Sequence, residues 1–208
     1  MSEAGVAGTL RARHRVSDET LLDAAVEVFA SVGFDRANMD VIAARAGVTK
    51  PTLYARMGSK EQLFAAAAKR EYELRKQTLF AAYEIAGGTF RDQLHRWTAA
   101  YFDFVRDRPE GFRLLTEAER HPECAAIIER AHRDIVKRIA EVVMTVSSRR
   151  SAHGAQLVAA MIAGMLSAGA QEAVGTKRAD FARAAALCES FLYGAVRGVD
   201  PQLIDAIR

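Results

Sequence analysis

The sequence contains very few residues that interrupt helices, and this scarcity restricts the possible folds more than any other feature. Only four of the 208 residues are proline, and neither glycine nor proline occurs from Lys60 to Ala86. A helix over that segment would be roughly 40 Å long, at about 1.5 Å per residue. No part of the sequence shows the sustained alternation of apolar and polar residues that is typical of strands. The sequence therefore predicts an all-α fold.

Capping residues, glycines and prolines divide the chain into about nine to ten predicted helices. These helices cover about 17–33, 38–47, 49–58, 60–86, 89–106, 109–120, 123–147, 152–174, 178–197 and 201–207. Residues 1–16 are small and polar with a basic cluster, and they are interpreted as a flexible arm. We expect an N-terminal unit at 1–58 and a larger helical bundle at 59–208.

Composition excludes several classes of protein. Half of the residues are hydrophobic and 26% are charged, which suits a packed core rather than a disordered chain. Cys124 and Cys188 lack the spacing of a zinc site or a disulfide framework. No apolar run approaches about 20 residues, and the N-terminus lacks the apolar core of a signal peptide. We therefore expect a soluble cytoplasmic protein with no membrane partner.

Residues 38–58 have the spacing of a helix-turn-helix. Asn38 and Thr49 are residue types that cap helix N-termini, while Gly47 and Gly58 are suited to ending helices. The first of the two helices spans about eight residues and is followed directly by a tight turn and the second helix.

The stretch from Ala44 to Lys60 contains four basic residues and no acidic residue, although the net charge of the chain is only +3. A basic, acid-free helix is suited to DNA because each phosphate that it neutralises releases counterions. Hydroxyl groups on Thr49, Thr52 and Tyr54 add hydrogen-bonding groups. Charge alone is equally consistent with a solvated helix face. The spacing of the two helices favours DNA binding.

The run from 21 to 64 has a distinctive order of residues: Ala24-Ala25, Phe29, Gly33-Phe34, Asn38 to Ala43, Ala46 to Tyr54, and Ser59 to Phe64. It resembles the DNA-binding domain of TetR-family transcriptional regulators. The resemblance implies phosphate contacts from Asn38, Tyr54 and Lys60. The alternative for Tyr54 is that it only packs against Phe34. The resemblance also implies base-edge contacts nearby, so the expected DNA-binding residues are Asn38, Arg45, Thr49, Lys50, Pro51, Thr52, Tyr54, Arg56 and Lys60.

Proteins of the TetR family usually bind small molecules in the C-terminal bundle, so the resemblance implies a ligand site there. Aromatic residues form a stripe at helical spacing within 90–104, and methionines follow in later helices. Such side chains suit an adaptable cavity for a small apolar effector, although plain core packing explains each residue individually. The expected pocket residues are Phe80, Tyr83, Trp97, Tyr101, Phe104, Phe112, Met144, Met161 and Met165.

Small residues are concentrated at 159–170 and again at 182–195. They allow helices to approach closely, either within one chain or between two copies. Because the family dimerises through its last two long helices, we expect a homodimer with a four-helix interface around a two-fold axis.

The evidence for catalysis or for a metal is weak. Glu129 and His132, like Asp92 and His95, have a spacing seen in metal-binding bundles, but arginines surround both pairs. No nucleophile signature or phosphate-binding loop is present. We therefore expect no enzyme activity, no metal and no cofactor.

The combined features predict a repressor that a small apolar ligand releases from double-stranded, palindromic operator DNA. Its half-sites would lie about 34 Å apart. The alternative is a ligand- or metal-binding helical bundle without specific DNA regulation.

Overall fold

The computed structural model describes residues 16–85, 87–147, 151–176 and 179–200, together with 202, 204 and 206. Within these residues all regular elements are helical, which confirms the predicted all-α class. The expected basic arm lies outside the described residues except for Val16. The expected helix at 201–207 lies outside them except at three positions.

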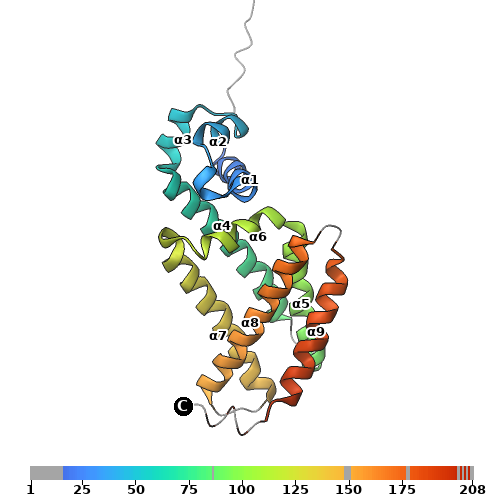
Figure 1. Cartoon of the computed structure of the whole chain (residues 1–208). Helices are drawn as coiled ribbons and strands as arrows, with labels where there is room; N and C mark the ends of the chain where they lie inside the picture. The colour runs from blue at the N-terminus through green and yellow to red at the C-terminus, as the bar shows by residue number, and fades with distance from the viewer. Residues whose placement is uncertain are drawn as a thin grey trace, which may run out of the picture.

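The helices form a small N-terminal unit and a larger bundle that one long helix connects (Figure 1). The N-terminal unit contains α1 (Asp18–Arg36), α2 (Met39–Arg45) and α3 (Lys50–Met57). The connecting helix is α4 (Lys60–Glu84). The bundle contains α5 (Phe90–Asp107), α6 (Pro109–Ala118), the short 3-10 helix η1 (Pro122–Cys124), α7 (Ala125–Ser147), α8 (Ala152–Gly175) and α9 (Phe181–Gly198).

Side-chain caps explain where the first four helices begin. Ser17, Asn38, Thr49 and Ser59 each accept a hydrogen bond from a backbone N–H in the first turn of the helix that follows. Such a bond satisfies an amide that has no partner within the helix. These caps confirm the predicted starts of both helices in the helix-turn-helix.

Gly33 kinks α1 rather than ending it. Its φ of 79° is a conformation that favours glycine, and a last helical turn continues to Arg36. The amide of Phe34, just after the kink, donates a hydrogen bond of 2.6 Å to Oε1 of Glu117 on α6. The kink therefore brings the end of α1 into contact with the bundle.

The hydrophobic core of the N-terminal unit extends into the bundle. Leu21, Phe29, Ile42 and Leu53 are fully buried in it. The same cluster includes the start of α4 and buried residues of α6 and η1, namely Leu63, Phe64, Ala67, Ala68, Leu114, Ala118 and Cys124. The expected boundary between residues 58 and 59 therefore falls within one continuous hydrophobic core, which contains residues from both expected units.

The α8 helix corrects one expectation from the sequence. Among the described helices it is the one long and apolar enough to cross a membrane, with a mean hydropathy of 1.5 and 28% of its most apolar window buried. Its many alanines raise the hydropathy without forming an obvious run of large apolar residues. This helix packs on α7 and α9 and leaves Leu157 and Met161 exposed.

Candidate DNA-binding surface and ligand cavity

The α3 helix presents one face to the core and the other to solvent. Leu53 is fully buried, whereas Thr49, Lys50, Pro51, Thr52 and Tyr54 are exposed. Asn38, which caps α2, is exposed as well. Arg45, at the end of α2, is also exposed, so the structure brings seven of the nine expected DNA-binding residues onto the exposed part of the helix-turn-helix.

Tyr54 does not follow the alternative in which it packs against Phe34. Its side chain is 43% exposed. The ring of Phe34 instead contacts the rings of Phe29, Phe64 and His121. The Tyr54 hydroxyl is therefore on a surface that a DNA backbone can approach.

Two basic residues of this surface are held by single exposed carboxylates. Nζ of Lys50 lies 2.9 Å from Oδ2 of Asp40, and this hydrogen bond raises the pKa of Lys50 above its usual value. Arg45 forms an ion pair with Glu27, and both side chains are half exposed. Exposed pairs of this kind contribute little stability, so DNA phosphates can compete for both cations.

Arg56 is engaged inside the N-terminal unit. Its guanidinium donates to the backbone oxygen of Val16 at 2.5 Å and forms an ion pair with Asp18, and its side chain is only 17% exposed. Arg56 therefore links α3 to the start of α1. A contact with a base edge would require it to leave both partners.

Lys60 is also engaged by the protein. Its Nζ donates to the backbone oxygens of Asp35 and Ala37, each at 3.2 Å, and lies 4.5 Å from the centre of the Phe34 ring. Asp35 lies in the last turn of α1, and Ala37 lies in the connection between α1 and α2. In the free protein Lys60 therefore holds the start of α4 against this connection.

The bundle contains a cavity of about 600 Å³ between α4, α5, α7 and α8. The apolar wall of this cavity is formed by Leu79, Ile135, Ile139 and Leu166. This volume lies within the range typical of small-molecule sites. The remaining lining residues are Tyr72, Arg75, Tyr83, Tyr101, Glu119, Ala125, Ile128, Glu129, His132, Ala163, Gly164, Ser167, Ala168 and Gln171.

The lining differs from the pocket expected from the sequence. Tyr83 and Tyr101 line the cavity, whereas Met161 is 61% exposed on α8. The other expected residues lie in the core of the bundle outside this lining: Phe80, Trp97, Phe104, Phe112, Met144 and Met165. Helical spacing in a sequence shows which residues share a face of a helix, but it does not show which face lines the cavity.

The cavity also contains a charged residue that sequence reasoning missed. Arg75 is 6% exposed, and its guanidinium carbon lies 4.4 Å from the centre of the Tyr72 ring. Burial raises the pKa of Tyr72 to about 12 and also raises the pKa values of Tyr83 and Tyr101, so these phenols stay neutral at physiological pH. In the sequence, only its place along the helix could have identified Arg75 as a buried residue, because it shares the buried face of α4 with Glu71 and Tyr72.

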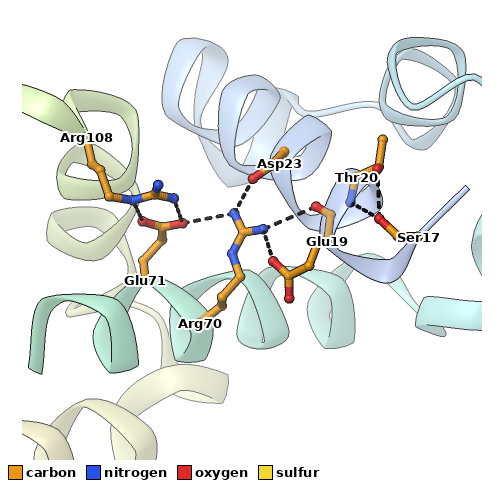
Figure 2. Close-up of polar contacts among 7 residues, drawn as sticks. All are labelled: Ser17, Glu19, Thr20, Asp23, Arg70, Glu71 and Arg108. Atoms are coloured by element: carbon orange, nitrogen blue, oxygen red, sulfur yellow. Dashed lines mark hydrogen bonds and ion pairs between the residues drawn. The ribbon is translucent and has the colours of Figure 1, made fainter. Parts of the chain in front are cut away.

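A charge network centred on the buried Glu71 connects α4 to the N-terminal unit and to the rest of the bundle (Figure 2). Glu71 is fully buried and accepts hydrogen bonds from Arg108 at 2.8 and 2.7 Å and from Arg70 at 2.9 Å. Arg70 also pairs with Glu19 and Asp23 of α1, at 3.0 and 2.8 Å. Since Arg108 directly precedes α6, the network ties α1, α4 and α6 together.

The residues with metal-like spacing have other partners. Glu129 is paired with Arg133 at 2.5 Å, and His95 lies 2.7 Å from Glu189 of α9. Within the described ranges, no cluster of three histidine, cysteine or acidic side chains is placed to hold a metal ion.

The fold and the two sites define a class of regulatory protein, with a helix-turn-helix unit joined by one helix to an all-helical bundle that contains a cavity. The family model described as "Bacterial regulatory proteins, tetR family" matches residues 21–67. A second family model, described as "Tetracyclin repressor-like, C-terminal domain", matches residues 89–194. The chain belongs to the TetR family of bacterial regulatory proteins, as the resemblance in the sequence indicated.

Individual relatives agree with this assignment. The chain is 34% identical over 144 residues to the HTH-type transcriptional activator FasR of Mycolicibacterium smegmatis. That match covers 67% of this chain and 64% of FasR, so the chain spans slightly less than two thirds of this relative.

Solved structures show the same fold. A TetR-like transcriptional regulator from Rhodococcus sp. RHA1 is 30% identical, with 88% of this chain and 96% of that chain covered and a TM-score of 0.71. FadR from Bacillus subtilis, solved in complex with stearoyl-CoA, is 19% identical, with 88% and 100% covered and a TM-score of 0.73. The latter likeness concerns the fold alone.

Proposed function

We propose that this protein is a homodimeric transcriptional regulator that binds a palindromic operator and leaves it when a small ligand fills the cavity in the bundle. One observation carries the proposal. The α4 helix begins at Lys60, directly after the exposed α3 helix, and its later turns line the cavity with Tyr72, Arg75, Leu79 and Tyr83. A single helix therefore contacts both candidate sites.

The proposed DNA interface is the exposed face of α3 together with the start of α2. Lys50, Pro51 and Thr52 would lie at base edges, and the remaining exposed groups would contact phosphates. Arg56 and Lys60 join this interface only by exchanging their protein partners for DNA. Lys60→Ala should then lower the salt dependence of binding by about one unit of slope, while Arg56→Ala should change the preferred sequence.

The proposed dimer interface covers the exposed apolar side chains of α8 and α9. Leu157 and Met161 of α8 are 48% and 61% exposed, and Leu187 and Phe191 of α9 are 71% and 64% exposed. Exposed large apolar side chains on neighbouring helices favour a protein interface. A second copy of the same two helices would cover them, and this also explains the apolar character of α8 without a membrane.

The proposed switch acts through α4. A ligand that changes the tilt of α4 would also move α1, since Arg70 of α4 pairs with Glu19 and Asp23 of α1. Ligand and DNA then bind different arrangements of the same dimer, with a coupling of about 5- to 150-fold. FadR of Bacillus subtilis was solved with stearoyl-CoA. The apolar wall of this cavity supports an effector with a long hydrocarbon chain.

Footprinting on the intergenic DNA beside the gene tests the proposal. We expect protection of a palindrome with half-sites about one helical turn apart. Lys50→Ala should weaken this binding, whereas Lys69→Ala, on the exposed face of α4, should leave it nearly unchanged. Binding of equal strength to all sequences would instead favour the alternative, a ligand-binding bundle without specific regulation. The family consists of regulatory proteins, and we propose no catalytic role and a cytoplasmic site of action.

A further inference from the structure

We propose that the effector is an amphiphile with a free carboxylate, which Arg75 binds inside the cavity while the hydrocarbon tail lies against the apolar wall. This inference rests on the proposed function, because it assumes that the cavity is the effector site. It specifies the chemical class of ligand, where sequence analysis predicted only an apolar molecule.

Arg75 is a buried cation without a full set of partners. More than nine-tenths of the residue is buried, and its Nε has no hydrogen-bond partner. Its guanidinium lies against the face of the Tyr72 ring. A buried charge and a buried N–H that lacks an acceptor are both costly, so such a group favours an anionic partner.

The acidic residues near Arg75 that the structure describes do not neutralise it by direct pairing. Glu71, one turn earlier on α4, is occupied by Arg70 and Arg108. Glu119 accepts a hydrogen bond of 3.4 Å from the Tyr72 hydroxyl, and its residue is exposed to solvent. Glu129 at the cavity pairs with Arg133. In the part of the chain that the structure describes, none of these carboxylates forms an ion pair with Arg75.

The remainder of the cavity suits a hydrocarbon chain. Leu79, Ile135, Ile139 and Leu166 line it and come from α4, α7 and α8. A planar guanidinium donates two parallel hydrogen bonds to a carboxylate, which fixes the orientation of the bound group. A fatty-acid-like molecule combines the two features that the lining offers.

A coenzyme A thioester has a different distribution of charge. Its thioester carbonyl is neutral, and its phosphates lie at the far end of a long polar arm. Such a ligand would place no negative charge on the first atoms after the hydrocarbon chain. The charge at Arg75 therefore distinguishes a free acid from its thioester.

Calorimetric titration of the protein, residues 1–208, with dodecanoate, dodecanol, methyl dodecanoate and dodecanoyl-CoA tests this inference. We expect dodecanoate to bind about 10- to 150-fold more tightly than the alcohol or the ester, as is typical for hydrogen bonds to charged groups. Arg75→Met, which retains an apolar stem, should abolish this preference. Arg75→Lys should restore part of it, because the charge returns without the two parallel donors.

Lys76→Met is the matched control. Lys76 is the next residue on α4, but it pairs with Glu73 and Asp134 in a groove between α4 and α7. Its replacement should leave the preference for the acid intact. Circular dichroism verifies the fold of each variant. If Arg75→Met does not fold, the affinities of the unmodified protein for dodecanoate and dodecanol still show whether the cavity prefers the carboxylate.

Two results would overturn the inference and leave the proposed function standing. One is equal affinity for acid and alcohol, with both releasing operator DNA. The other is tighter binding of the thioester than of the acid, unchanged in Arg75→Met. If none of the four compounds binds while operator binding persists, both this inference and the proposed role of the cavity are wrong.

Discussion

Replacement of Glu71 by glutamine should destabilise the protein far more than its conservative chemistry suggests. Glu71 is fully buried and accepts three charge-assisted hydrogen bonds from Arg108 and Arg70. Breaking a buried charge pair typically costs about 3–5 kcal/mol. The amide of glutamine retains one acceptor, but its NH₂ group faces guanidinium donors. We therefore expect a loss near the lower limit, at about 3 kcal/mol.

The matched control is Glu73→Gln, two residues later on the same helix. Its carboxylate is half exposed and lies 3.4 Å from Nζ of Lys76. Exposed pairs contribute about 0.2–1 kcal/mol, so this change should have little effect. For a chain of this size, about 3 kcal/mol corresponds to a decrease in thermal midpoint of about 6–12 °C.

Calorimetric melting at one protein concentration measures both variants, because the stability of the proposed dimer depends on concentration. Similar midpoints for Glu71→Gln and Glu73→Gln would refute the reasoning. They would show that the network in Figure 2 does not hold α1, α4 and α6 together.

Three further predictions concern other parts of the molecule. Gly111→Ala should lower the thermal midpoint, since a Cβ there would lie 2.3 Å from Oε2 of Glu71, whereas Gly198→Ala, with open space around it, should not. Phe191→Glu should shift the mass measured by light scattering from dimer to monomer, whereas Arg183→Glu on the same helix should leave a dimer. Burial raises the pKa of Tyr72 to about 12 from 10.0, so the folded state retains this proton longer than the unfolded state. Unfolding free energy should then fall between about pH 10 and pH 12, and denaturant titrations should show a smaller fall in Tyr72→Phe.

Local features of the sequence predicted the helix-turn-helix well. Capping by Asn38 and Thr49 depends on hydrogen bonds within one turn, so residue type and spacing are sufficient to identify it. The exposed positions of α3 follow from the same periodicity, because the buried Leu53 fixes which face meets the core.

Interactions between distant segments could not be predicted in the same way. Arg56 pairs with Asp18, 38 residues away, and this pairing depends on how α1 packs beside α3. The cavity lining likewise depends on the rotation of each bundle helix, so a stripe containing Trp97 and Tyr101 was divided between core and cavity. Arg75 was missed because an arginine in a charged stretch usually indicates a solvated face.

The central claim is that one helix couples ligand binding to DNA binding, and a pair of titrations tests it most directly. Dodecanoate, with dodecanol as its neutral counterpart, is titrated into the dimer with and without a saturating operator fragment. We expect operator DNA to raise the ligand Kd by about 5- to 150-fold, and saturating ligand to raise the operator Kd by the same factor. An unchanged Kd for a compound that binds the cavity would contradict coupling through α4.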